Sequence, residues 1–198
     1  MEKNDLLFMM DDSVSDNKES IIDYMLSWTL RMSSVSNDNF NNVVRDYCKK
    51  ILFKIMLVDI DMINENYKII QSVKIWKQWR GIDLCAEIEF IDKNENLSKH
   101  ALLIEDKAYS SIHGDQLNRY KNIFEEHYKG TEFEENLHYV YFTIKERDRI
   151  FDDEILCKEA GYIAYTMEEI REYLWPGNVV IPPTGNEIFD EFWIKNWG

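Results

Sequence analysis

The sequence predicts a single α/β (α+β) domain in which helices flank a mixed central sheet. Its 198 residues include 45% hydrophobic and 14% aromatic side chains, which is enough for one substantial core but too few for two domains. Apolar residues recur first at helical spacing, then alternate with a period of two, and then return to helical spacing. We therefore expect one domain over residues 1–198.

Two helices are expected first. Residues 1–16 are acidic, and we expect a frayed segment there. Apolar residues then recur at helical spacing from Glu19 to Met32, and again at three- and four-residue steps from Phe40 to Val58. The second of these helices is the longer one.

Three strands should follow. Ile69–Trp76 is rich in β-branched residues, and Ile82–Phe90 alternates apolar and polar positions, with a turn between them at Arg80-Gly81. Asp92–Asn96 has the composition of a second turn. The short apolar run Ala101–Ile104 is typical of a strand that is buried on both faces.

Helical spacing returns over Asp115–Tyr128, and two further strands are predicted at Tyr139–Ile144 and Tyr162–Tyr165. Thr166 and Glu169 then form a capping-box pattern that opens another helix.

The C-terminal segment 184–198 is predicted to be a helix docked on the core. It follows Pro182-Pro183 and carries an aromatic stripe, which is more often core than a partner-binding surface: Ile188, Phe189, Phe192, Trp193 and Trp197.

Composition excludes several classes of protein. No apolar run approaches the roughly 20 residues needed to cross a bilayer, and no segment is typical of a signal peptide. We therefore expect a cytoplasmic protein without a membrane partner. Cys48, Cys85 and Cys157 are odd in number and widely spaced, which indicates reduced packing residues rather than disulfides or a zinc site.

The net charge of −14 disfavours non-specific binding to nucleic acid, because lysine and arginine normally supply that affinity. The charge is unevenly distributed, however. Residues 66–121 hold nine lysines and arginines against eight aspartates and glutamates. The middle of the chain could therefore tolerate a polyanion.

Two carboxylates and a lysine are predicted to meet in this middle part. Residues two apart in a strand point to the same side, so Glu105 and Lys107 share a face. If the two strands pair through the 92–96 turn, Asp83 comes to lie beside Glu105. Oxygen ligands of this kind suit Mg²⁺, for which Mn²⁺ could substitute.

An acid, any residue and a lysine is a weak pattern by itself, and it occurs twice here. The instance at Asp16-Asn17-Lys18 lies in a polar segment, whereas Glu105-Asp106-Lys107 directly follows a predicted strand. A surface salt bridge at the end of that strand is the alternative interpretation.

Three segments together resemble a known family: Trp79-Arg80-Gly81-Ile82-Asp83-Leu84, Leu102-Leu103-Ile104-Glu105-Asp106-Lys107 and Gln116-Leu117-Asn118-Arg119-Tyr120. They look like the PD-(D/E)XK nuclease superfamily, in particular its uncharacterised bacterial and phage-associated branch with a Gln-Leu-x-x-Tyr helix. Gly-Ile-Asp stands here in place of the Pro-Asp of the superfamily's name.

The resemblance implies a restriction-endonuclease-like αβββαβ core and a magnesium-dependent nuclease. It implies that Asp83, Glu105 and the backbone carbonyl of Asp106 bind the metal and that Lys107 is the catalytic lysine. Glu19 on the first helix is the candidate that would complete the site; a helix N-terminal acid is the other interpretation.

Residues of the 115–128 helix are assigned to the substrate. Gln116 and Tyr120 lie four apart on one helical face. The resemblance implies that this face lines the cleft, with Gln116 contacting a phosphate or the metal-bound water; a polar rim beside a packed tyrosine is the alternative. We assign Tyr120, Arg119 and Arg80 to substrate binding.

Other polar residues are less informative. His100 is expected to be a hydrogen-bonding surface residue. A small basic patch could grip a backbone phosphate, although a solvated charge run is the default interpretation: Lys145, Arg147 and Arg149.

Two functions follow from these patterns. The first is a nuclease that cuts DNA, within a defence, repair or mobile-element context implied by the resemblance. The second is an inactive nuclease-fold module that binds protein or nucleic acid, which would explain the acidic charge and the aromatic C-terminal helix. Intact Asp83, Glu105 and Lys107 favour the enzyme. The sequence leaves open whether the protein forms a homodimer.

Overall fold

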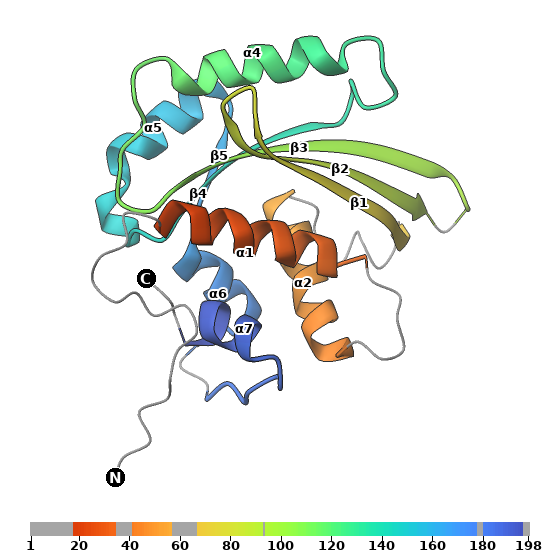
Figure 1. Ribbon diagram of the computed structural model, residues 1–198, viewed down its shortest axis with the longest axis vertical. Helices are drawn as coiled ribbons and strands as arrows, with labels where there is room; N and C mark the ends of the chain where they lie inside the picture. The colour runs from red at the N-terminus through yellow and green to blue at the C-terminus, as the bar shows by residue number, and fades with distance from the viewer. Residues whose placement is uncertain (1–17, 35–40, 57–66, 93, 178–179, 196–198) are drawn as a thin grey trace.

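The chain is described here from a computed structural model (Figure 1). The structure describes residues 18–34, 41–56, 67–92, 94–177 and 180–195, with the backbone alone for 67–69. The frayed segment expected at residues 1–16 lies outside this part of the chain.

Helices and strands follow one another in this order: α1 (Lys18–Met32), α2 (Asn42–Ile55), β1 (Tyr67–Trp79), β2 (Ile82–Asp92), β3 (Leu97–Lys107), α4 (Gln116–Tyr128), β4 (Leu137–Thr143), η1 (Arg147–Arg149), α5 (Phe151–Ala160), β5 (Ile163–Thr166), α6 (Met167–Leu174), α7 (Glu187–Phe189) and the π-helical turn η2 (Asp190–Ile194). The sheet has the order β1-β2-β3-β4-β5. Its first three strands are antiparallel, while β4 and β5 are parallel to β3. The predicted α+β fold with a mixed central sheet is confirmed.

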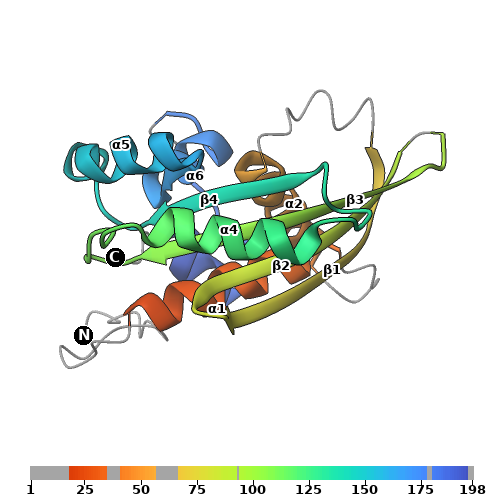
Figure 2. The same ribbon diagram turned by 90° about the horizontal axis from the view of Figure 1, so that it is seen from above.

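Helices cover both faces of the sheet (Figures 1 and 2). Helices α1, α2, α6 and α7 lie on one face, and α4 with α5 lies on the other. Successive strand residues point to opposite faces, so Leu84 and Ala86 contribute to the core under α1 and α2, whereas Cys85 contributes to the core under α4. Strand β3 is buried from His100 to Lys107, as expected for a central strand covered on both sides.

One helix was missed by the sequence interpretation. Helix α5 lies between β4 and β5, where no helix was predicted. Its apolar residues Ile155 and Leu156 are exposed, so the sequence shows no clean apolar stripe. Its ends carry the better signal, namely an acidic first turn and Gly161, which has the positive φ of 80° that is common after a helix.

The C-terminal helix is shorter than predicted. Helix α7 and η2 cover residues 187–194 rather than 184–198, and Trp197 lies outside the described residues. Phe189, Phe192 and Trp193 are completely buried, while Ile188 is 39% exposed. The aromatic stripe therefore belongs to the core.

The prediction that His100 lies at the surface is wrong. His100 is buried and lies against the His138 ring, with 3.0 Å between the His100 Nδ1 and His138 Nε2 atoms. For the basic residues the default interpretation, a solvated charge run, holds for Arg147 and Arg149, which are 47% and 70% exposed, but not for Lys145, which is buried. All three form ion pairs: Lys145 with Asp153, Arg147 with Glu154 and Glu169, and Arg149 with Glu146.

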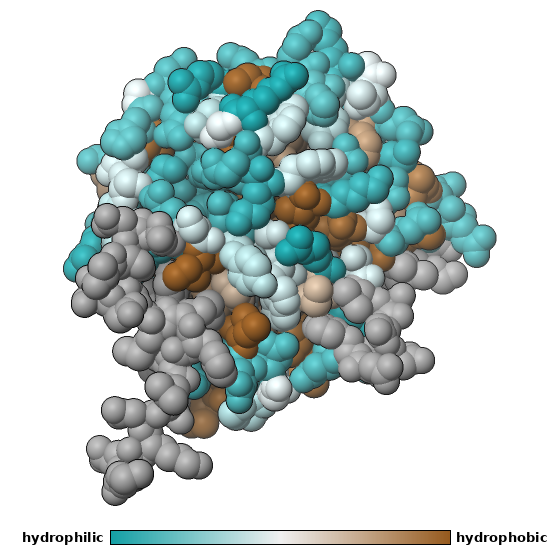
Figure 3. Space-filling model, viewed as in Figure 1, coloured by the Kyte–Doolittle hydropathy of each residue, from teal (hydrophilic) through white to brown (hydrophobic). Residues whose placement is uncertain are grey.

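The surface is in keeping with the acidic composition. On the face shown in Figure 3, hydrophilic residues predominate and hydrophobic residues occur in small groups. Within the described residues, no helix combines the length and apolar character that crossing a bilayer requires. All three cysteines are free and buried.

The buried hydrogen bond between Trp193 and Thr29 should stabilise the docking of the C-terminal segment. The Trp193 indole nitrogen donates to the Thr29 hydroxyl at 3.0 Å. Thr29→Val would leave this buried donor unpaired, and we expect the free energy of unfolding in urea to fall by about 1–3 kcal/mol. In a Trp193→Phe background the same change should cost less, because no indole donor is left. Equal costs in both backgrounds would contradict this role.

Candidate active site

The β1–β2 hairpin places the first acid of the site. Trp79 pairs with Ile82, so the turn consists of Arg80 and Gly81 alone. Both have positive φ, 53° and 87°, as a tight two-residue turn between twisted strands requires. A Cβ on Gly81 would lie in ordinary contact with the Tyr120 hydroxyl, at 3.4 Å, so the positive φ rather than a lack of space favours glycine here.

The register of β2 and β3 brings Asp83 to Glu105. Leu84 pairs with Ile104 in the antiparallel ladder. One residue further along, Asp83 lies across from Glu105. The Asp106 backbone N–H donates to the Asp83 carboxylate at 3.2 Å, which holds that side chain against the neighbouring strand.

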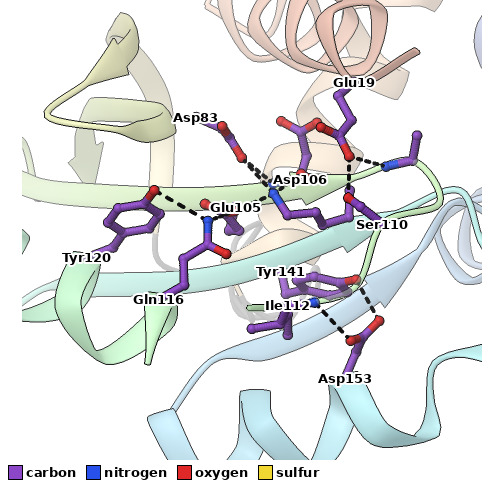
Figure 4. A network of polar contacts seen from close by, with 12 residues as sticks. Glu19, Asp83, Glu105, Asp106, Ser110, Ile112, Gln116, Tyr120, Tyr141 and Asp153 are labelled. Carbon is purple, nitrogen blue, oxygen red and sulfur yellow. Dashed lines mark hydrogen bonds and ion pairs between the residues drawn. The ribbon is translucent and has the colours of Figure 1, made fainter. Parts of the chain in front are cut away.

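Three oxygen atoms surround the Lys107 ammonium group (Figure 4). The Nζ atom lies 2.5 Å from Glu105 Oε1, 3.0 Å from the backbone carbonyl of Asp106 and 3.5 Å from Asp83 Oδ2. These are the three groups that the resemblance assigned to a metal. The structure therefore brings the predicted ligands around one positive charge, and the salt bridge is buried rather than at the surface.

Burial makes this cluster electrostatically unusual. The Glu105 side chain is fully buried, and those of Lys107 and Asp83 are 8% and 20% exposed. Burial raises the pKa of the Glu105 carboxyl to about 8; Asp83 adds to the rise and Lys107 opposes it. For Lys107, burial lowers the pKa, but Glu105 and Asp83 raise it further, so the ammonium stays protonated.

Gln116 completes the contacts of Glu105. Its side-chain amide donates to Glu105 Oε1 at 2.6 Å and lies 3.3 Å from the Tyr120 hydroxyl, so both residues face the cluster as predicted. Two buried atoms here have no hydrogen-bond partner among the described residues: Glu105 Oε2 and Gln116 Oε1. Buried polar atoms are normally paired. The cluster therefore has two oxygen atoms that could accept a further hydrogen bond or bind a cation.

Glu19 lies at the edge of the cluster. Its Oε1 atom accepts from the Ser110 hydroxyl at 2.6 Å and from the Ala108 N–H at 3.4 Å. It contributes to raising the pKa of Lys107, but no hydrogen bond joins it to Asp83 or Glu105 in the described structure. In this structure Glu19 ties helix α1 to the segment after β3.

The Asp106 side chain points away from the cluster. It is buried against helix α1, where burial and the nearby Asp23 raise its pKa well above the ordinary range. Lys77 Nζ lies 3.9 Å from the Asp23 carboxylate. The backbone carbonyl of Asp106 thus faces the cluster, whereas its side-chain carboxyl lies on the opposite face of the sheet.

Gln78 was missed by the sequence interpretation. Its amide donates to Asp83 Oδ1 at 3.2 Å, and it has a positive φ of 54°. Such a backbone conformation is strained for a residue other than glycine, and strain of this kind concentrates at functional sites. The two-residue turn was the available signal, because it sets Gln78 across from Asp83.

Two guanidinium groups lie beside the cluster on aromatic rings. Arg80 stacks over Trp79 at 4.9 Å from the ring centroid, and Arg119 stacks over Tyr120 at 5.0 Å. Both side chains are exposed. No carboxylate pairs with either of them within the part of the chain that the structure describes.

A divalent metal fits this donor set. Two carboxylates and a carbonyl converge on one cation, and Glu105 Oε2 is free to bind. Among the described residues no three acidic, histidine or cysteine side chains gather as a group that could hold a metal. The site therefore depends on the backbone carbonyl of Asp106.

Comparison with known proteins gives a family match. The family model described as PD-(D/E)XK nuclease superfamily matches residues 9–177. Among solved structures, MspJI restriction endonuclease in complex with a 27-mer oligonucleotide is similar, with 13% sequence identity and a TM-score of 0.32. That match covers 90% of this chain, which spans 36% of the length of the MspJI chain. No curated protein matches the sequence.

The raised pKa of Glu105 predicts a particular dependence of stability on pH. The ordinary value is 4.5, against about 8 in the folded protein, so between these values the folded state holds one more proton than the unfolded state. The stability that this residue contributes is present below pH 4.5 and is lost as the pH rises through 8. In EDTA, we expect the melting temperature of wild type to fall relative to that of Glu105→Gln between pH 5 and pH 8.

A control variant isolates this effect. Glu126 lies on α4 with a side chain that is 78% exposed. The melting temperature of Glu126→Gln should therefore equal that of wild type at every pH. Parallel curves for wild type and Glu105→Gln would show that Glu105 titrates normally.

Proposed function

This chain belongs to the PD-(D/E)XK nuclease superfamily, and we propose that it is a magnesium-dependent nuclease that hydrolyses phosphodiester bonds in DNA. Nucleases of this superfamily usually use divalent metal ions; Mg²⁺, with Mn²⁺ as a substitute, is our proposal for this member. DNA as substrate and a role in phage defence or mobile elements rest on the resemblance described above.

The convergence of three oxygens on the Lys107 ammonium carries this proposal. Asp83, Glu105 and the Asp106 carbonyl would hold the cation, as the free Glu105 Oε2 atom supports. A divalent cation bound there would polarise a phosphoryl oxygen and lower the pKa of a water molecule.

Lys107 has a defined role in this chemistry. Glu105 and Asp83 raise its pKa, which favours the ammonium form. It can donate hydrogen bonds to the attacking water or to the negative charge that develops on the phosphoryl oxygens. The water gives up a proton to the solvent as its oxygen bonds to phosphorus, the bond to one ester oxygen breaks, and the leaving oxygen takes a proton from the solvent. The products are a phosphomonoester end and a hydroxyl end.

Gln116, Tyr120 and the two arginines are proposed to bind the substrate. The unpaired Gln116 Oε1 atom can accept from the attacking water, and Glu105 positions the amide. Arg80 and Arg119 offer guanidinium groups that can donate two parallel hydrogen bonds to a phosphate. They give a protein of net charge −14 a local site for a polyanion.

Glu19 stays a candidate for completing the metal site, by releasing the loop at Ser110 when a cation binds. The cytoplasm is the proposed location, and three free, buried cysteines support a reducing compartment.

One of the two arguments for an inactive module, the aromatic C-terminal helix, does not hold. The described aromatic residues of the C-terminal segment, Phe189, Phe192 and Trp193, are buried in the core and form no partner surface. The acidic charge is its remaining support. An active nuclease is therefore the function that the site favours.

Cleavage assays test the enzyme directly. We expect wild type with Mg²⁺ or Mn²⁺ to cut plasmid DNA, linear single strands or RNA, and EDTA to stop it. Asp83→Ala and Lys107→Ala should each lower the rate about 10²–10³-fold, because each removes electrostatic stabilisation from the transition state. Lys99→Ala is the matched control, since Lys99 lies on the same strand and pairs with Glu132. Cleavage that persists in both site variants would indicate a contaminant.

Calorimetric titration with Mn²⁺ tests the ligand set. Asp83→Asn and Glu105→Gln should abolish binding because each removes a charged oxygen ligand. Asp106→Asn should retain binding within a few-fold, because Asp106 contributes only its carbonyl. Loss of binding in a folded Asp106→Asn variant would contradict this assignment, and a wild type that binds no Mn²⁺ would favour the inactive module.

A further inference from the structure

An aromatic pocket lies on the same sheet face as the candidate active site. It is about 240 Å³ in volume and is lined by Trp76, Trp79, Cys85, His127 and Tyr128. Strand β1 supplies the two tryptophans, β2 supplies the cysteine, and the C-terminal end of α4 supplies the other two rings. Figure 2 shows α4 lying across the sheet.

The rings of this pocket are held in place by their contacts. The Trp79 and His127 rings have centroids 4.7 Å apart, and the Tyr128 hydroxyl donates to Glu87 at 3.3 Å. Trp76, in contrast, is 39% exposed. A planar aromatic group could therefore stack on Trp76 without displacing the rest of the pocket.

The pocket is continuous with the candidate active site. Trp76 pairs with Cys85, which lies two residues, or about 7 Å, from Asp83 on the same strand face. From the other side, Trp79 adjoins the Arg80-Gly81 turn that packs against Tyr120, and Tyr120 contacts Gln116. A group bound in the pocket beside Cys85 would therefore lie close to a phosphate bound at Asp83 and Glu105.

Charge at the opening favours an anionic ligand. Arg80 stacks on the outer Trp79 ring and has no carboxylate partner in the described parts of the chain. Lys74 is exposed on the same face of β1 as Trp76, across from Glu87, whereas Lys77 points to the opposite face of the sheet, toward Asp23. An aromatic pocket with cations at its edge suits a group that combines a planar ring with a phosphate.

We propose that this pocket binds one nucleobase of the strand whose phosphodiester lies at Asp83, Glu105 and Lys107. This inference rests on the proposed nuclease function and extends it to a class of substrate. The pocket is smaller than the roughly 300–1,000 Å³ of sites for drug-sized ligands, as a single base requires. A base can enter only when it is out of the helical stack, so the substrate is single-stranded or locally unpaired.

Binding of labelled oligonucleotides tests the pocket. The probes are a fluorescein-labelled 15-mer of thymidylate, a 15-mer with the same backbone but abasic throughout, and the thymidylate 15-mer paired with its complement. Fluorescence anisotropy is measured in Ca²⁺, with strand integrity checked on gels. We expect wild type to prefer the thymidylate strand to the abasic strand and to the duplex by about fivefold or more.

Substitutions at Trp76 locate this preference. Trp76→Ala should weaken binding of the thymidylate strand about fivefold or more and leave the abasic strand unchanged. Trp76→Phe should restore most of the affinity, because it retains a ring for stacking. Phe151→Ala is the control, since Phe151 is 68% exposed on α5, outside the pocket, and should behave as wild type.

The outcomes separate this inference from the nuclease proposal. Equal weakening of both strands by Trp76→Ala, or no preference for bases in wild type, would overturn the base pocket and favour another occupant, such as a side chain of a partner protein. Absence of binding to every probe would overturn it as well. Base-dependent binding without any metal-dependent cleavage would leave the pocket standing and refute the nuclease alone. Cleavage without base dependence would refute the pocket alone.

Discussion

The antiparallel register between β2 and β3 is the constraint on which the site depends. It sets Asp83 across from Glu105 and lets the Asp106 N–H bind the Asp83 carboxylate. A shift of one residue would turn Asp83 to the face that α1 and α2 cover and would bury Leu84 against α4. The hydrophobic contacts of both sheet faces therefore fix the position of the acids.

Much of the site was predictable because short-range rules determine it. Period-two alternation told which of the residues 105–107 share a face, and the turn at 92–96 told which strands pair. The helical spacing of Gln116 and Tyr120 placed them on one side of α4. The sequence could not predict which charged groups contact one another. The position of the Lys107 ammonium among all three oxygens, for example, depends on burial.

Other parts of the molecule escaped prediction for physical reasons. Helix α5 exposes apolar residues, so its periodicity is weak and only its ends reveal it. The residues from Lys145 to Arg149 looked like a cationic patch, but acidic residues of α5 and α6 pair with Lys145 and Arg147 once the chain is folded, which the linear sequence does not specify. The aromatic pocket joins two strands to the far end of α4. Its rings have no common spacing in the chain.

Strand β3 lies in the middle of the sheet, with β2 on one side and β4 on the other. Strand β2 pairs with it as far as Ile104, and β4 pairs with it through Glu105 and Lys107, so the backbone that carries these two residues is held by its neighbours in the sheet. Adjustments that admit ions or substrate would therefore come more easily from α4, the β1–β2 turn and the segment at Ser110 than from this strand. The side chains of the site would then keep their positions, and the elements around them would adjust to the substrate.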